Sequence, residues 1–253
     1  MTGFGVLMRK ELLEQWRTWR MLVVGIIFAI FGIGSPILAR YTPELVKALA
    51  SDQFTGVIPT PTITDAIVQF QKNLGQTGIL AAILLAMGSV AVEKERGTAA
   101  LLLTKPLARG AFLSAKLAAI GATLLVGTLV AGIGAYAYTA FLFSAPPLAG
   151  YAAMCGLLFL SLMTYASLTF LGSTLTRSSL AAAGIGIGAM VLVAIFSALP
   201  TIGSWAPGNL GDPAMALALG SPVHGLLPPL ASTILLVVVA YALAWLSFRR
   251  QEL

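Results

Sequence analysis

The chain has 253 residues, of which 58% are hydrophobic and only 9% are charged; its mean hydropathy is +0.93 and its net charge is +6. Soluble domains carry about 25% charged residues, so this composition excludes an ordinary soluble domain and predicts a membrane protein. The positive charge does not indicate nucleic-acid binding, because the Lys and Arg residues stand beside apolar runs instead of alternating with aromatic residues. The single cysteine, Cys155, cannot form an internal disulfide and is interpreted as a small buried hydrophobic residue.

Six apolar runs are long enough to cross a hydrocarbon core of about 30 Å, which takes about 20 helical residues. They lack the alternating pattern of barrel strands, and the first run is too long for the apolar core of a cleaved signal, so we expect six helices. The runs are Met21–Ala39, Gln76–Val92, Phe112–Phe143, Leu148–Thr174, Ser179–Leu199 and Leu226–Phe248. The sequence therefore predicts an all-α polytopic membrane protein with a single transmembrane domain over residues 1–253.

Residues 1–20 are predicted to form an interfacial helix on the membrane surface. Apolar residues recur on one face at helical spacing and charged residues occupy the other faces. The apolar set is Phe4, Met8, Leu12, Trp16 and Trp19, and the charged set is Arg9, Lys10, Glu14, Arg17 and Arg20. Two interpretations fit this pattern: an ordinary juxtamembrane anchor, or an elbow that braces a bundle or a partner.

The two longer segments outside the spans, 40–75 and 200–225, are expected to be structured. In the first, Thr42-Pro43-Glu44 has the pattern of a helix start, and a second helix is expected to end at Gly75. We expect both helices to lie on the outer surface or to cap the bundle, with substrate gating as the alternative. In the second segment, Asp212-Pro213 is expected to start a short apolar helix that dips into the outer leaflet and stops at Gly220.

Glycines suggest where the spans bend or pack. The third run exceeds the bilayer thickness, so we expect it to tilt, to kink near Gly132 and Gly134, or to project into the cytoplasm. Gly184 and Gly188 in the fifth run form a small-xxx-small pair that predicts a close helix contact or a dimer seam. The only histidine, His224, has no neighbouring ligand or acid, so neither a metal site nor a catalytic site is predicted.

A polar island between the second and third spans, Glu93 to Lys116, holds seven of the 24 charged residues, and the 60 residues that follow it carry no formal charge. Inside it the apolar stretch Ala99–Leu103 lies between a helix-start signal, Gly97-Thr98, and a stop at Pro106. Leaving leucines in water forgoes about 1.5 to 3 kcal/mol per side chain, so the stretch needs a cover. The candidates are the membrane surface and a partner protein.

Charge counts predict the orientation. Twelve Lys and Arg residues lie on the side of the polar island, and three, Arg40, Lys47 and Lys72, lie on the other side. The positive-inside rule therefore places both termini and the island in the cytoplasm. We expect a multi-pass protein of the plasma membrane, such as a bacterial or archaeal inner membrane.

Several chemistries are missing from the sequence. There is no G-x-x-x-x-G-K-[ST] phosphate loop, no H-E-x-x-H motif and no paired cysteine motif. The middle of each span also lacks Asp, Glu, Lys and Arg, which proton- or ion-coupled transporters generally require. If the protein moves a cargo, we expect the energy to come from outside the membrane.

The polar island and its setting resemble the membrane subunits of ATP-binding-cassette transporters of the type-2 exporter class. The resemblance rests on the N-terminal Arg-Lys-Glu run, the six spans and an E-x-E-x-G-T…L-x-x-x-P-x-x-R…K pattern. In this sequence the pattern comprises Glu93, Glu95, Gly97, Thr98, Leu101, Leu102, Leu103, Lys105, Pro106, Arg109 and Lys116. About 25 residues carry this specific motif, while the architecture resembles the family along the whole chain.

The resemblance implies a coupling loop at residues 93–111 that inserts the helix Ala99–Leu103 into a groove on a separate ATPase. Glu93 and Glu95 would fix the base of the loop to the inner membrane edge, and Lys105 and Arg109 would meet acidic or backbone groups of the ATPase. The residues assigned to coupling are Glu93, Glu95, Arg96, Gly97, Thr98, Leu101, Leu102, Leu103, Lys105, Pro106 and Arg109. Those assigned to the interfacial elbow are Arg9, Lys10, Glu11 and Trp16.

The resemblance also implies partners. Two membrane subunits, identical or related, would face each other over two ATPases, which would bind ATP and Mg, so no cofactor or enzyme activity is expected in this chain. The predicted function is therefore the permease half of an ATP-driven exporter. The alternative is a membrane anchor that docks an ATPase and external proteins without moving cargo; an intramembrane enzyme is disfavoured, because one His and no buried acid leave little for an active site.

Overall fold

The computed structural model describes residues 3–49, 60–97 and 109–251, and within these ranges it contains helices and no strand. A short helix, α1 (Phe4–Arg17), precedes the long helices, and two 3-10 turns and a short helix lie between the last two of them. The other α-helices are α2 (Arg20–Leu49), α3 (Ile63–Met87), α4 (Ala91–Glu95), α6 (Arg109–Leu142), α7 (Leu148–Leu175), α8 (Ser179–Ala198), α9 (Gly211–Ala218) and α10 (Leu227–Arg250).

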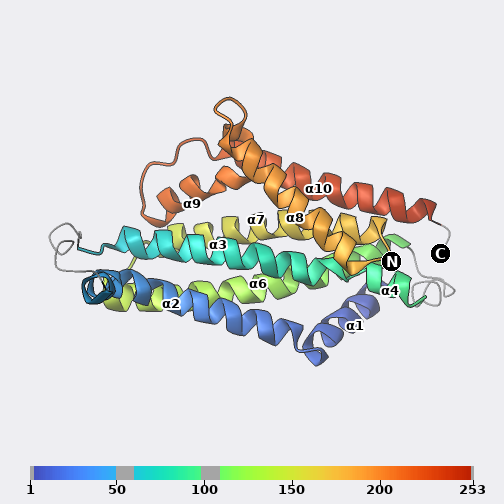
Figure 1. Cartoon of the computed structure of the whole chain (residues 1–253), viewed down its shortest axis with the longest axis horizontal. Coiled ribbons are helices and arrows are strands. Elements are labelled where there is room, and N and C mark those ends of the chain that lie inside the picture. Colours follow the sequence, from blue (N-terminus) through green and yellow to red (C-terminus); the bar gives the residue numbers. More distant parts are fainter. Residues whose placement is uncertain (1–2, 50–59, 98–108, 252–253) are drawn as a thin grey trace.

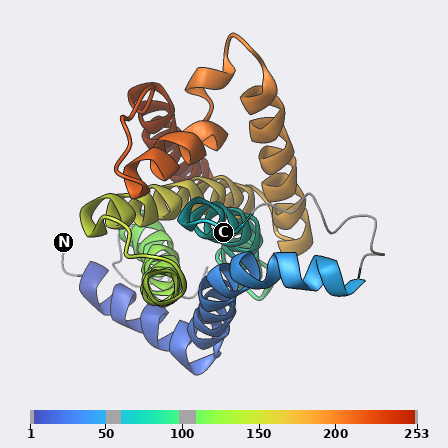
Figure 2. The same cartoon turned by 90° about the vertical axis from the view of Figure 1, so that its left-hand side faces the viewer.

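Helix α7 lies at the centre of the bundle. It contacts α3 and α6 on one side and α8, α9 and α10 on the other. Figure 1 shows the long helices running side by side, and the end view in Figure 2 shows α1, α2 and α6 on one side of the α3–α7 pair and α8, α9 and α10 on the other. A movement of α7 would therefore displace helices in both groups.

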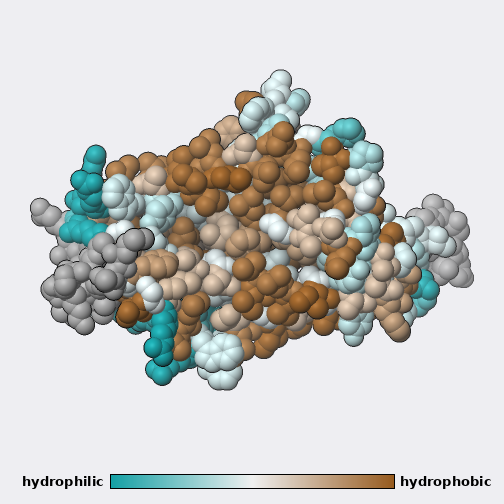
Figure 3. All heavy atoms as spheres, turned by 180° about the vertical axis from the view of Figure 1, so that it is seen from behind, coloured by the Kyte–Doolittle hydropathy of each residue, from teal (hydrophilic) through white to brown (hydrophobic). Residues whose placement is uncertain are grey.

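Six helices are long and apolar enough to cross a membrane: α2, α3 with α4, α6, α7, α8 and α10. The space-filling view in Figure 3 shows apolar side chains over the middle of the molecule and polar ones towards its ends. The predicted all-α fold with six spans is confirmed. The bilayer requires about 20 residues per helix, and the observed helices meet or exceed this length.

The helix start predicted at Thr42-Pro43-Glu44 and the helix end predicted at Gly75 are both wrong. Helix α2 continues through Pro36 and Pro43 to Leu49, and α3 runs through Gly75 to Met87. Figures 1 and 2 show the last part of α2 turned aside from the rest of that helix, as expected of a helix with internal prolines. Gly75 does not end α3, because the buried stripe continues past it and packing outweighs the helix cost of one glycine, about 1 kcal/mol.

The segment between α8 and α10 contains the predicted short helix. Helix α9 ends as expected at Gly220, which has a φ of +67° and forms the paired closing bonds of a Schellman motif, Gly220 N to Leu217 O and Ser221 N to Ala216 O. Asp212 lies in the first turn and does not cap the helix with its side chain, because α9 begins one residue earlier, at Gly211. Two 3-10 turns, Gly203–Trp205 and Pro207–Leu210, connect α8 to it.

Glycines bring α2 and α6 into close contact. A Cβ on Gly32 would lie 2.5 Å from the backbone oxygen of Ala131, so only glycine fits there. By contrast, a Cβ on Gly184 or Gly188 would meet no described atom within 4 Å, so this pair does not form a helix contact inside the described bundle, and its role in a dimer stays a prediction. Helix α6 is one helix of 34 residues through Gly132.

We expect the Gly32→Ala substitution to destabilise the bundle, because the added methyl group meets backbone that cannot rotate away. Overpacking of this kind costs about 1 to 3 kcal/mol. Gly34→Ala is the matched control, since a Cβ there would meet no described atom within 4 Å. Thermal unfolding of both variants in detergent measures the difference. Equal midpoints would show that the close contact between α2 and α6 at Gly32 does not require glycine.

Candidate functional site at the charged end of the bundle

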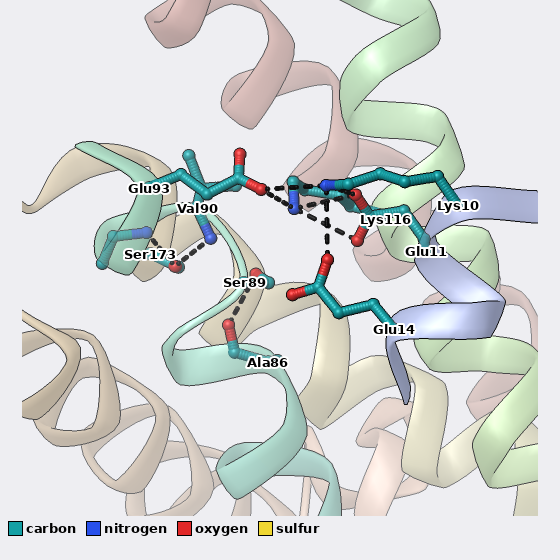
Figure 4. A network of polar contacts seen from close by, with 10 residues as sticks. Lys10, Glu11, Glu14, Ala86, Ser89, Val90, Glu93, Lys116 and Ser173 are labelled. Atoms are coloured by element: carbon teal, nitrogen blue, oxygen red, sulfur yellow. Dashed lines mark hydrogen bonds and ion pairs between the residues drawn. The ribbon is translucent and has the colours of Figure 1, made fainter. Parts of the chain in front are cut away.

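Three helices bring five charged side chains together at one end of the bundle. We call these residues the Lys116 cluster: Lys10, Glu11, Glu14, Glu93 and Lys116. The Nζ atom of Lys116 lies 3.1 Å from both carboxylate oxygens of Glu11 and 2.8 Å from Oε1 of Glu93. The Nζ atom of Lys10 lies 3.0 Å from Glu11, 3.3 Å from Glu14 and 3.4 Å from Glu93 (Figure 4). The cluster thus joins α1, α4 and α6.

Helix α1 presents a polar face to α6 and an apolar face away from it. Its buried residues are Leu7, Glu11 and Gln15, which follow one another at intervals of four and therefore share one side of the helix. The Gln15 side chain accepts a hydrogen bond from the hydroxyl of Thr123 on α6. Trp16, in contrast, is 55% exposed. This two-sided character fits a helix held to the bundle by polar contacts while its apolar side faces lipid.

Burial makes the ion pairs of Lys116 mutually dependent. Its side chain is 4% exposed and that of Glu11 is 10% exposed, so neither charge is well solvated without the other. The pKa of Lys10 is lowered by burial, but its hydrogen bond to Glu11 and the charges of Glu11, Glu93 and Glu14 outweigh this effect and raise the pKa above its usual value. Lys10 therefore remains protonated at neutral pH and holds the outer side of the cluster.

A second set of contacts holds the break between α3 and α4. The backbone N–H groups of Val90 and Ala91 both donate to the hydroxyl oxygen of Ser173 on α7, each at 3.0 Å (Figure 4). The ammonium group of Lys94 donates to the backbone oxygen of Thr174 at 2.7 Å, and that oxygen also accepts from Gln251 at 3.0 Å. The end of α4 is thereby attached to the end of α7.

A third set of contacts attaches the start of α6 to the end of α10. Arg109 donates to the backbone oxygens of Phe248, Arg249 and Gln251 at 2.9 to 3.3 Å. A cation placed on the last carbonyls of a helix satisfies groups that lack helical partners and interacts favourably with the helix dipole. The rings of Phe112 on α6 and Phe248 on α10 also stack, with their centroids 5.7 Å apart.

The structure describes only part of the predicted coupling set. Glu93 lies in the Lys116 cluster, and Glu95 and Arg96 are exposed beyond it. Gly97 has a φ of +69° and follows the end of α4, while the helix start predicted after it, at Thr98, lies outside the described residues and stays a prediction. Six further coupling residues lie outside the described residues: Thr98, Leu101, Leu102, Leu103, Lys105 and Pro106.

The remaining predicted residues are within the described part of the chain. Arg109 binds the end of α10, and its contact with an ATPase stays a prediction. Of the elbow residues, Lys10 and Glu11 enter the Lys116 cluster, while Arg9 and Trp16 are exposed. Sequence reasoning missed the pairing of Lys116 with Glu11 and the role of Ser173. A signal for the first was available: Glu11 lies off the apolar stripe, at the four-residue spacing that also contains Leu7 and Gln15.

The described residues contain no group of three or more His, Cys, Asp and Glu side chains that could hold a metal ion. The cluster itself pairs carboxylates with ammonium groups, which leaves the carboxylates engaged in ion pairs. The cluster binds α1, α4 and α6 to one another. Residues 98–108 connect α4 to α6 in the sequence.

Comparison with known proteins decides the family. The family model for the ABC-2 family transporter protein matches residues 6–216, which include α1, the Lys116 cluster and α7. The chain belongs to this family. It is also 29% identical over 209 residues to the uncharacterized transmembrane protein YxlG of Bacillus subtilis, with 81% of this chain and 80% of that protein covered. Membership makes it a multi-pass membrane protein of ABC transporter permease type, and implies a partner ATPase.

Two further relatives carry the printed name of probable ABC transporter permease protein NosY. The protein from Pseudomonas aeruginosa is 34% identical over 131 residues, which is 51% of this chain and 42% of that protein. The protein from Stutzerimonas stutzeri is 32% identical over 124 residues, which is 48% of this chain and 40% of that protein. The alignments thus span about two fifths of the length of these two relatives.

We expect the Lys116→Met substitution to destabilise the protein by about 3 to 5 kcal/mol, because it leaves the buried carboxylate of Glu11 without its main partner. The loss should shrink when Glu11→Gln is added, since the second change removes the stranded charge. Arg9→Met, which alters an exposed cation on the same helix, serves as the control. Thermal unfolding of the wild type, the Lys116→Met, Glu11→Gln and Arg9→Met single variants and the Lys116→Met, Glu11→Gln double variant measures the coupling; strictly additive effects would contradict a direct interaction.

We expect the Ser173→Ala substitution to loosen α4, because the N–H groups of Val90 and Ala91 lose their shared acceptor. Each buried donor left unsatisfied costs about 1 to 3 kcal/mol. Ser167→Ala is the control, because the buried hydroxyl of Ser167 donates to Thr164 O in its own helix. Hydrogen exchange of residues 88–96 should accelerate in the first variant and stay unchanged in the second. Equal exchange in both would show that Ser173 does not hold α4.

Proposed function

We propose that this chain is the membrane subunit of an ATP-driven exporter, which moves a cargo when a separate ATPase hydrolyses ATP. The proposal places the charged end of the bundle in the cytoplasm, where the ATPase and its ATP and Mg would be found, in agreement with the excess of Lys and Arg at that end. It places the protein in the plasma membrane of a bacterium or archaeon. Two ABC permease relatives, named NosY, support the transporter class without indicating this chain's cargo.

One observation carries the proposal: the two helices that flank residues 98–108, α4 and α6, are bonded to the central and last helices. On one side, α4 is bonded to Ser173 and Thr174 of α7. On the other, Arg109 at the start of α6 is bonded to the end of α10. A partner that pulled or pushed this segment would therefore act directly on α7 and α10, and not on a freely hinged loop.

The anchors define a lever. Helices are rigid along their axes, so displacement at the charged end is transmitted over their length to the opposite end. The Lys116 cluster would hold α1 to the moving ends of α4 and α6, because separating its buried charges is costly. Helix α1 would then move together with the spans along the membrane surface, while its apolar face remained in lipid.

We further propose that two membrane subunits pair. Helix α8 supplies a candidate surface, because Gly184 and Gly188 are exposed together with Leu180, Ile187 and Val191 on a helix that is largely unburied in the single chain. Small residues allow close approach of helices in membranes. The second subunit can be a copy of this chain or a homologue of it, and the transmission of displacement along the helices of this chain is the same in both cases.

The test is coupling between the ATPase and this chain. We expect a separate ATPase with a phosphate-binding loop to co-purify, and its activity in proteoliposomes to change when this subunit is present. Leu102→Glu should abolish that effect, because a charge replaces an apolar side chain that needs a cover. Leu102→Met, which keeps the apolar character, is the matched control and should retain it.

Unaltered coupling in the Leu102→Glu variant, with the protein still folded, would contradict the proposed function. Binding of the ATPase without any ATP-dependent flux from vesicles would instead support the alternative of a docking scaffold. Thermal unfolding in detergent distinguishes an uncoupled variant from a misfolded one, since only misfolding lowers the midpoint.

A further inference from the structure

An open groove lies between the last turns of α7 and α10, and its volume is about 580 Å³. Four leucines line most of it, Leu171, Leu175, Leu243 and Leu246. Three of them are between 42% and 52% exposed, so the groove opens on the outside of the described bundle. Figure 1 shows this end of α10 at the same end of the bundle as α4. The groove is therefore an apolar surface at the charged end of the molecule.

The lining of the groove changes from apolar to polar along α10. Leu243, Leu246 and Arg250 follow one another at intervals of three and four residues, so they share one side of the helix. Leu243 precedes Arg250 by seven residues, or about 10 Å at 1.5 Å per residue. The groove thus extends from the end of the span into a hydrocarbon core of about 30 Å. A ligand that fills it needs a polar end and an apolar remainder.

The polar end of the groove offers two hydrogen-bond donors. Arg250 lines it with an exposed guanidinium group. The hydroxyl oxygen of Ser247 accepts from the amide of Gln251 at 3.2 Å, which leaves the hydroxyl proton of Ser247 to donate. A fixed cation beside a hydroxyl donor suits a phosphate group, because charge-assisted hydrogen bonds are the strong ones.

The positive charge around this end of the groove is not balanced by the described carboxylates. Lys94 and Arg177 lie close enough at the end of α7 for their like charges to repel each other. Within the described part of the chain, ion pairs engage Lys10 and Lys116 and no other cation. Glu95 is exposed and enters none of these pairs, and Glu252 lies outside the described residues. This region therefore attracts an anion.

The ends of two helices also meet at the groove, and their dipoles alone would disfavour an anion. Their last carbonyls are already engaged, however. The backbone oxygen of Thr174 on α7 accepts from Lys94 and Gln251, and the last carbonyls of α10 accept from Arg109. These two cations offset the negative helix ends, so Arg177 and Arg250 are left to interact with an added anion.

We propose that this groove binds an anionic phospholipid from the leaflet at the charged end of the bundle and holds it there as a structural ligand. The lipid phosphate accepts from Arg250 and Ser247, and an acyl chain lies along the leucines. A zwitterionic lipid carries an ammonium group as well, which Lys94 and Arg177 repel. The volume lies within the range of about 300 to 1,000 Å³ that is typical of ligand pockets.

The bound lipid fills the space between α7 and α10 and strengthens their contact at the end where α4 and α6 are attached to them. It is held by the protein and not moved across the membrane. The inference thus goes beyond the proposed function, and it holds whether or not the chain transports a cargo.

Native mass spectrometry of the purified protein in detergent, without ATP or an ATPase, measures the retained lipid. The probe is phosphatidylglycerol, which is anionic, compared with zwitterionic phosphatidylcholine that has the same acyl chains. We expect phosphatidylglycerol to be retained preferentially. Arg250→Gln should lower its affinity about tenfold, as the loss of one charge-assisted hydrogen bond would produce.

Arg249→Gln is the matched control, because it removes the same charge one residue away. The guanidinium of Arg249 lies over the ring of Trp245 and does not line the groove, so this variant should retain phosphatidylglycerol. Equal retention of the two lipids, unchanged affinity in Arg250→Gln, or equal losses in the two arginine variants would overturn the proposal.

Glycerol 3-phosphate distinguishes a lipid from a soluble phosphate ester, because it has the phosphate and lacks the acyl chains. We expect it not to displace phosphatidylglycerol at equal concentration; displacement would assign the groove to a soluble ligand and overturn the proposal. A dimer that retains no phosphatidylglycerol would assign it to a second copy instead. Should Arg250→Gln not fold, Ser247→Ala provides the second variant, with an expected loss of about fivefold in affinity. No loss in that variant would also overturn the proposal.

Discussion

The buried ion pairs of Lys116 are the interaction on which the charged end of the bundle depends. A single ammonium group contacts carboxylates from two other helices, Glu11 of α1 and Glu93 of α4. Because removing one buried partner leaves the others as uncompensated buried charges, the three helices depend on one another at this end.

The anchors on α7 and α10 complete this arrangement. Ser173 and Thr174 hold the end of α4, and Arg109 holds the end of α10, so α4 and α6 are each attached to a neighbouring helix. Helix α7 lies between the two halves of the bundle, so a single helix connects the proposed site of ATPase action with both halves.

Sequence reasoning predicted the features that depend on local composition. The six spans follow from the length of apolar runs, and the end of α9 follows from Gly220. It failed where packing outweighed local signals: no new helix starts at Pro43, and Gly75 does not end α3. It also missed the partner of Lys116: the position of Glu11 off the apolar stripe was visible, but the sequence does not indicate which helix meets it, and Lys116 lies 105 residues away. The residues of the predicted inserted helix lie outside the described residues, so that prediction stays open.

The uncharged stretch from Leu117 to Thr176, which includes nearly all of α6 and α7, has an energetic consequence. Moving one elementary charge through a membrane potential involves about 2.3 kcal/mol per 100 mV. A pair of spans without formal charge performs almost no electrical work as it tilts. The tilting of α6 and α7 should then be insensitive to voltage.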